Sequence, residues 1–280
     1  MTATSPVSFG ARVQAAMADR GQFCVGIDPH GALLRDWGLT DDAAGLETFA
    51  MTVVEAVAPH CSVVKPQSAF YERHGSRGVA VLERVIAESR AAGAQVLLDV
   101  KRGDIGSTSQ AYADAYLDPA SPLAADAITA SPFLGFGSLD PMVDTARRHG
   151  AGVFVLALTS NKEGPEVQHA TTDDGASVAG LVLDRLRGLN AGADPLGSFG
   201  AVVGATIADP AEDLAIHGPL LAPGYGEQGG GPADIARIFG GSARHVLASS
   251  SRAVLRLGPD RAAMTDAVRR ANDELAEALA

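Results

Sequence analysis

The segment of this sequence with the most chemical potential is a charged stretch that follows an apolar run, Leu97-Leu98-Asp99-Val100-Lys101-Arg102-Gly103-Asp104. An extended chain alternates its faces, so Asp99 and Lys101 point the same way while Val100 points the other way. Asp104 follows on the turn, close enough to pair with Lys101. Neighbouring carboxylates favour the charged form of a lysine in a partly dry site. We therefore expect an ammonium group held beside a substrate; the alternative is a solvated ion-pair cluster on a loop.

Two other charged residues follow apolar runs. Lys65 comes directly after Val63-Val64 and precedes Pro66-Gln67. A lysine at such a position often only extends to solvent, but here the carboxylates near Lys101 offer it partners. Asp28 ends the run Phe23–Ile27, where it either caps the following turn or binds a ribose hydroxyl.

Two late segments are suited to an anion. Residues 223–231 read Pro-Gly-Tyr-Gly-Glu-Gln-Gly-Gly-Gly, and glycines let backbone amides approach a phosphate closely. Residues 249–252 read Ser-Ser-Ser-Arg, and the guanidinium of Arg252 could hold the same phosphate through two hydrogen bonds. The alternative is an ordinary flexible connection with a surface arginine.

The elements that must position these residues form a repeating pattern. Short apolar runs are each followed by a polar or glycine-containing turn and then by a helical pattern, which predicts a parallel sheet. Eight such units predict a TIM (β/α)8 barrel, with its chemistry at the carboxyl ends of the strands; a doubly wound open sheet is the alternative. The expected strands are Phe23–Ile27, Ser62–Val64, Gln95–Val100, Ala127–Thr129, Gly152–Leu158, Ala201–Gly204, Leu220–Ala222 and His245–Ala248.

The same reading predicts helices and domain organisation. We expect amphipathic helices at Val79–Ala92, Pro141–His149 and Val178–Leu189 and a long loop at Thr159–Ser177. No composition shift or linker marks a second domain, so residues 1–280 are expected to form one. A closing helix is expected over Asp260–Ala280, with an apolar stripe at Ala263, Ala267, Ala271 and Leu275.

Composition limits the classes of partner. There are 33 acidic and 22 basic residues, a net charge of -11, so no global positive field attracts nucleic acid or an anionic membrane. Cys24 and Cys61 lie in apolar segments, which favours buried thiols in a reducing compartment. The sequence shows no secretory signal pattern and no membrane-length apolar run, so we expect a cytoplasmic protein.

Taken together, the Asp99–Ile105 motif, the upstream Lys65 and the downstream segment 223–229 resemble the orotidine 5'-phosphate decarboxylase family. The resemblance extends roughly from Phe23 to Leu255, with the motifs in the family's order. It is nearest to the longer bacterial branch, on the segments Lys65–Phe70 and Thr159-Ser160-Asn161.

The resemblance implies cofactor-independent conversion of orotidine 5'-phosphate to uridine 5'-phosphate and CO2, the last step of UMP biosynthesis. It implies no metal and no cofactor. By the same resemblance, Lys101 donates the proton, and Asp104 with Thr108 reaches the partner subunit's site in a homodimer. The implied catalytic residues are Lys65, Asp99, Lys101 and Asp104, and the implied substrate contacts are Asp28 (ribose), Ser131 (pyrimidine), Gln228 and Arg252 (phosphate), and Thr108.

Three other functions are alternatives for such a barrel. Related Mg²⁺-dependent barrels, the keto-gulonate phosphate decarboxylase and hexulose phosphate synthase group, place a glutamate where Lys65 stands, and a lysine would repel the cation. A non-catalytic nucleotide sensor would have little use for a costly charge network. A Schiff-base aldolase needs an uncharged lysine, which flanking aspartates disfavour.

Overall fold

The strands close into a single barrel. The computed structural model describes residues 6–208, 210–226 and 229–279. Within these ranges, parallel strands run in sequence order around the barrel, and the first pairs with the eighth. This confirms the predicted fold class, and the predicted strands differ from those observed by at most two residues at an end. The strands are β1 Phe23–Ile27, β2 Val63–Pro66, β3 Gln95–Arg102, β4 Ala127–Ala130, β5 Gly152–Leu158, β6 Phe199–Val203, β7 Leu220–Pro223 and β8 Val246–Ser250.

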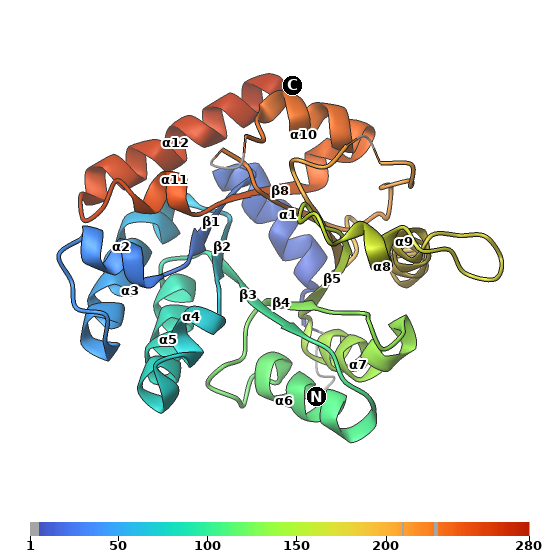
Figure 1. The fold of residues 1–280 in the computed structure, drawn as a ribbon, viewed down its shortest axis with the longest axis horizontal. Helices are drawn as coiled ribbons and strands as arrows, with labels where there is room; N and C mark the ends of the chain where they lie inside the picture. The colour runs from blue at the N-terminus through green and yellow to red at the C-terminus, as the bar shows by residue number, and fades with distance from the viewer. Residues whose placement is uncertain (1–5, 209, 227–228, 280) are drawn as a thin grey trace.

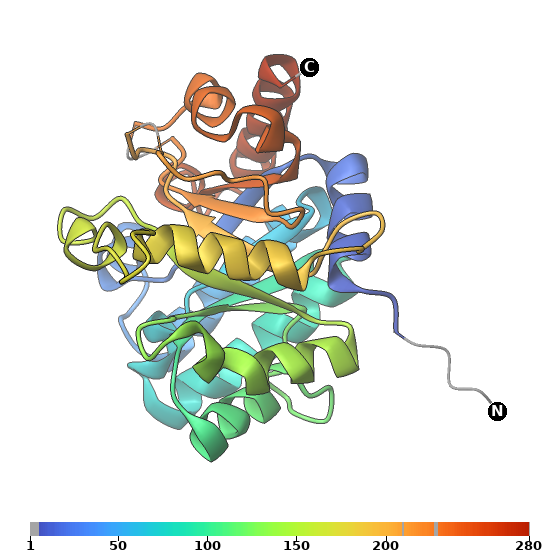
Figure 2. The same ribbon diagram turned by 90° about the vertical axis from the view of Figure 1, so that its right-hand side faces the viewer.

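Helices surround the strands (Figure 1). The turned view in Figure 2 shows α9 lying across the strands and shows α1 at the opposite end of the barrel from the loop after β5. Within the described ranges, no helix combines the length and apolarity needed to cross a bilayer. The helices are α1 Phe9–Arg20, α2 Gly31–Asp36, α3 Ala43–Val57, α4 Ala69–Glu72, α5 Gly75–Ala91, α6 Gly106–Leu117, α7 Asp140–His149, α8 Pro165–Gln168, α9 Val178–Leu189, α10 Pro232–Phe239, α11 Arg252–Leu255 and α12 Arg261–Ala278, with 3₁₀ turns at Ala58–His60, Phe136–Leu139 and Gly240–His245.

The closing helix is confirmed, and its buried face includes part of the predicted stripe together with two residues outside it. Asp260 caps α12 by accepting a hydrogen bond from the backbone N–H of Ala263. The buried residues of α12 are Met264, Val268 and Leu275, whereas Ala263 and Ala267 are only partly covered. The predicted Leu275 is buried and the predicted Ala267 and Ala271 pack against the core. The stripe left out Met264 and Val268, whose larger side chains bury more apolar area than alanine does.

The interior of the barrel is a separate apolar cluster closed from below by α1. Each strand contributes one buried side chain to it, and Phe9, Val13 and Met17 of α1 pack against this layer. Gly10 allows the approach, since a Cβ there would lie 2.0 Å from the carbonyl oxygen of Leu196. The strand residues of this layer are Cys24, Val63, Leu97, Ala127, Phe154, Val202, Leu221 and Leu247. The barrel thus has a filled amino end.

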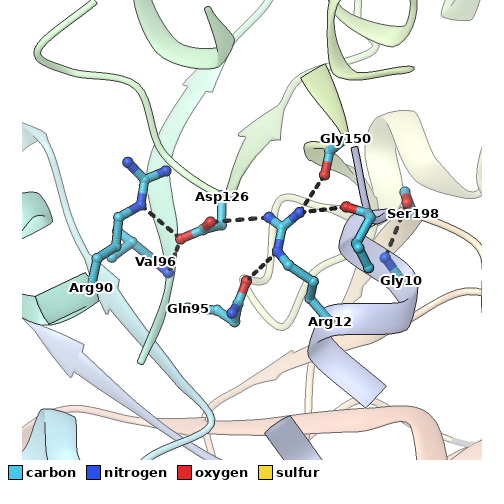
Figure 3. A network of polar contacts seen from close by, with 9 residues as sticks. Gly10, Arg12, Arg90, Gln95, Val96, Asp126, Gly150 and Ser198 are labelled. Carbon is cyan, nitrogen blue, oxygen red and sulfur yellow. Dashed lines mark hydrogen bonds and ion pairs between the residues drawn. The ribbon is translucent and has the colours of Figure 1, made fainter. Parts of the chain in front are cut away.

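Polar contacts fix α1 to the amino ends of the strands (Figure 3). Arg12 Nη2 and Arg90 Nε each lie 3.0 Å from the Asp126 carboxylate, just before β4. Arg12 Nε also donates to Gln95 Oε1 (3.1 Å) at the start of β3. The N–H of Gly10 donates to Ser198 Oγ (3.0 Å) just before β6. These bonds satisfy groups at the strand starts and orient the helix across them.

Candidate active site

The open, carboxyl end of the barrel holds a pocket of about 320 Å³. Its walls come from the ends of β1, β2, β7 and β8 and from the loops that follow them. Chemistry in such barrels gathers at this end, because every strand delivers its last side chains there. The lining residues are Asp28, His30, Lys65, Phe70, Pro223, Gly224, Tyr225 and Ser249–Arg252.

A buried carboxylate organises the charges beside this pocket. Asp99 is 5 % exposed, and Lys65 is 7 % exposed. Lys101 Nζ lies 2.6 Å from Asp99 Oδ1, and Lys65 Nζ lies 3.2 Å from Asp99 Oδ2. Thr129 Oγ1 donates to Oδ1 (2.7 Å), and Gln67 Nε2 donates to Oδ2 (2.8 Å). Each oxygen therefore has two donors, and the predicted sharing of one face by Asp99 and Lys101 is confirmed.

The network keeps its buried members charged. Burial opposes ionisation of Asp99, but Lys65 and Lys101 outweigh it and lower the pKa of Asp99 to about 2. Burial likewise opposes the charge of Lys65, yet Asp28 and Asp99 raise the pKa of that ammonium above its ordinary value. Opposite charges within a dry site favour both ionised forms. A carboxylate is thus fixed between two lysine side chains at neutral pH.

The backbone at Lys101 departs from regular strand geometry. The register of β3 against β4 shifts between Leu98 and Arg102, so residues 99–101 stand opposite Thr129 alone. Lys101 has a φ of +45°, in the left-handed region that a residue with a Cβ adopts at a cost of about 1–3 kcal/mol. The bulge is a local departure from the ladder with β4, and the Lys101 ammonium still contacts Asp99 Oδ1 across it.

The wall formed by β1, β7 and β8 carries polar atoms without protein partners. Asp28 Oδ1, the Tyr225 hydroxyl and the hydroxyls of Ser250 and Ser251 are buried and have no hydrogen-bond partner among the described residues. Burial raises the pKa of Tyr225 to about 12, so its hydroxyl remains a donor at neutral pH. Buried polar groups are normally paired. Asp28, Ser250 and Ser251 line the pocket, so a polar ligand seated there could bind their unpartnered oxygens.

The predicted substrate contacts Arg252, Gln228 and Ser131 have different placements. Arg252 lines the pocket beside Ser251. Gln228 lies outside the described residues. Ser131 donates its backbone N–H to the carbonyl of Arg102 (2.9 Å) and lines a neighbouring, more apolar pocket of about 440 Å³. The loop after β5, which contains α8, forms the far wall of that second pocket.

The structure does not bring Asp104 to Lys101 within one chain. The Asp104 carboxylate accepts a hydrogen bond from the backbone N–H of Ile105 (2.8 Å), at the start of α6. Among the described residues it forms no ion pair with Lys101. Thr108 lies one turn further along α6 and is exposed. Asp104 is partly buried.

Two contributors to the Asp99 network were not predicted as site residues. Gln67 is two positions after Lys65, so strand alternation puts it on the same face, and this signal was present in the sequence. Thr129 lies on β4, and its role follows from the β3 bulge, which no sequence pattern indicated. Pairing across strands becomes visible only in the folded barrel.

Comparisons with known proteins agree with one another. Residues 21–267 match the sequence model of the "Orotidine 5'-phosphate decarboxylase / HUMPS family". An orotidine 5'-phosphate decarboxylase from Nocardioides sp. is 74 % identical over 273 residues, covering 96 % of this chain and 99 % of the relative. The Streptomyces coelicolor protein of that name is 60 % identical, covering 97 % and 98 % of the two chains.

Solved structures give the same result. A crystal structure assigned to orotidine 5'-phosphate decarboxylase from Streptomyces avermitilis superposes with a TM-score of 0.97 at 59 % identity, covering 100 % of this chain and 98 % of that one. The orotidine monophosphate decarboxylase of Leishmania donovani superposes with a TM-score of 0.73 at 29 % identity, covering 98 % and 100 %.

Proposed function

Since the chain belongs to the orotidine 5'-phosphate decarboxylase / HUMPS family, we propose that it converts orotidine 5'-phosphate to uridine 5'-phosphate and CO2, the last step of UMP biosynthesis. The observation that carries the proposal is the Lys65–Asp99–Lys101 network beside a pocket of unpartnered polar atoms. The proposal assigns residues 1–280 to one catalytic barrel domain that uses neither a metal nor an organic cofactor.

The chemical problem is the carbanion left at C6 of the pyrimidine ring. Its electron pair lies in the ring plane, where the π system cannot delocalise it. In the proposed mechanism the C6–carboxylate bond breaks, CO2 departs, and Lys101 Nζ transfers a proton to C6. The neutral amine then regains a proton from water. Asp99 faces the departing carboxylate, and their repulsion is relieved as CO2 leaves.

A lysine alone does not account for catalysis. One preorganised donor contributes about 2.7–4 kcal/mol, whereas enzymes commonly lower barriers by about 8–23 kcal/mol. Binding of the remote phosphate and ribose supplies the rest by fixing the reacting carbon and excluding water. We assign the ribose to Asp28, the phosphate to Arg252 and Gln228, and the pyrimidine to Ser131. The unpartnered hydroxyls of Ser250 and Ser251 support a phosphate nearby.

The test of this function is direct. Purified protein is mixed with orotidine 5'-phosphate in the presence of EDTA, and the ultraviolet absorbance of the substrate is followed. We expect loss of that absorbance with formation of uridine 5'-phosphate. Activity that EDTA abolishes would favour the Mg²⁺-dependent relatives, and tight nucleotide binding without turnover would favour a sensor.

We also propose a homodimer in which Asp104 and Thr108 complete the partner's site. Support comes from apolar side chains exposed on the adjoining loops after β3 and β4: Ile105 is 62 % exposed, Phe133 75 % and Leu134 52 %. The two segments adjoin, because the Ser131 N–H donates to the Arg102 carbonyl (2.9 Å), and the Ser109 Oγ of α6 donates to the Ser138 carbonyl of the 3₁₀ turn (3.0 Å). Exposed apolar groups gathered at one place are typical of an interface.

Subunit mixing tests the shared site. Lys101→Ala and Asp104→Ala are each expected to be inactive as homodimers. After denaturation and refolding of an equal mixture, half the dimers are mixed, and one of the two sites in each is intact, so about a quarter of the activity returns. A mixture that stays inactive would place Lys101 and Asp104 in the same subunit's site.

The same assignment includes a cytoplasmic location. Cys24 and Cys61 are both free and buried, and burial raises the pKa of Cys24 to about 12, so its thiol is unreactive. Free thiols without disulfides are typical of a reducing compartment.

A further inference from the structure

Thr129 on β4 joins the two residues on which the proposed chemistry depends. Its side chain is 1 % exposed. Thr129 Oγ1 accepts a hydrogen bond from the backbone N–H of Lys101 (2.9 Å) and lies 2.7 Å from Asp99 Oδ1. The bulge removes Lys101 from the regular ladder with β4. The threonine hydroxyl therefore takes the place of the backbone carbonyl that would normally receive this N–H.

The direction of both hydrogen bonds is fixed by chemistry. The N–H of Lys101 can only donate, so it uses a lone pair of the hydroxyl. The single hydroxyl hydrogen is then left for the carboxylate of Asp99, which is ionised and can only accept. One hydroxyl thus holds the left-handed backbone of Lys101 at one side and the Asp99 carboxylate at the other. The Lys101 ammonium closes the ring by binding the same oxygen, Asp99 Oδ1 (2.6 Å).

We propose that Thr129 is a positioning residue for the decarboxylation, because it sets the backbone from which Lys101 reaches the reacting carbon. This rests on the proposed function. Thr129 does not line the substrate pocket, so its loss leaves the ribose and phosphate contacts in place. A displacement of about 1 Å at a reacting group costs roughly 10²-fold in rate. The effect belongs on kcat rather than on KM.

The experiment compares Thr129→Val, which keeps the shape without the hydroxyl, with Thr129→Ser, which keeps the hydroxyl. Decarboxylation of orotidine 5'-phosphate and the Kd for uridine 5'-phosphate are measured for both. Thr145→Val is the matched control: Thr145 is fully buried on α7, and its hydroxyl accepts from Gln110 Nε2 (3.1 Å), away from the mouth. Melting temperatures are recorded for all three variants.

We expect Thr129→Val to lose roughly 10- to 100-fold in kcat with KM and Kd close to wild type. Thr129→Ser and Thr145→Val should retain most of the activity. A wild-type kcat in Thr129→Val, or an equal loss in Thr129→Ser, would overturn the positioning role. If Thr129→Val does not fold, Thr129→Ala is judged by the same criterion. An inactive wild-type protein would instead overturn the proposed function, which separates the two failures.

Discussion

Replacing Lys65 by methionine tests whether Asp99 is held as a buried carboxylate. Lys65 is almost fully buried and contacts Asp99 Oδ2 at 3.2 Å. A carboxyl whose pKa falls from 3.8 to about 2 gains about 2.5 kcal/mol of stability in its ionised form. Removing one partner of a buried pair typically costs about 3–5 kcal/mol. We therefore expect Lys65→Met to lower Tm by roughly 10 °C at pH 7.

The stability that Asp99 contributes depends on pH in a definite direction. The Asp99 pKa is lowered by folding, so its contribution is present above the unfolded value near 3.9 and is lost as pH falls through about 2. Without Lys65 the Asp99 pKa moves upward, and acid unfolding of the variant should begin at a higher pH.

The assay is thermal melting of wild type and variant from pH 7 down to pH 3. Lys162→Met is the control for loss of a lysine, since the Lys162 side chain is 91 % exposed and its Nζ lies 4.0 Å from Glu163. Exposed pairs of this kind contribute about 0–1 kcal/mol. If Lys65→Met has the same Tm as wild type at every pH, the reasoning about the buried carboxylate is refuted.

Three further predictions concern the mouth and the floor of the barrel. Lys101→Ala should abolish turnover and leave the Kd for uridine 5'-phosphate nearly unchanged; full activity in this variant would exclude Lys101 as the proton donor. Arg252→Ala should lower kcat/KM, with inorganic phosphate competing less well than against wild type; an unchanged kcat/KM would place the phosphate elsewhere. Asp126→Asn weakens the contacts to Arg12 and Arg90 and should cost about 1–3 kcal/mol at constant kcat, measured by melting and initial rates; a loss of kcat without loss of Tm would contradict a purely structural role.

The fold was predictable because each strand is marked by a local sequence pattern. Apolar runs bounded by turn residues marked β1 and β5 to the residue, and the amphipathic period marked α9 equally well. The predicted stripe of α12 omitted Met264 and Val268 because several registers of a helix rich in alanine are nearly equivalent. Packing of Met264 and Val268 against the core decides among them, and this information lies in the tertiary structure.

The site was only partly predictable for the same reason. Asp99 and Lys101 share a face by simple alternation, which the sequence states directly. Thr129 enters the network through a bulge, where the spacing along one strand no longer equals the spacing along its neighbour. The position of Asp104, away from Lys101 in its own chain, depends on the turn into α6. Local patterns do not specify such turns or what a second subunit would bring.

The floor built by α1 also has a kinetic consequence. Phe9, Val13 and Met17 pack against the strand interiors and fill the amino end of the barrel. Substrate and product therefore reach the pocket from the carboxyl end. Under the proposed function, the nucleotide, carbon dioxide and the proton that recharges Lys101 would all enter or leave at the carboxyl end. We expect the bound product nucleotide to separate the neutral Lys101 amine from bulk water. Reprotonation of Lys101 would then follow product release, and the rate of release would limit the next turnover.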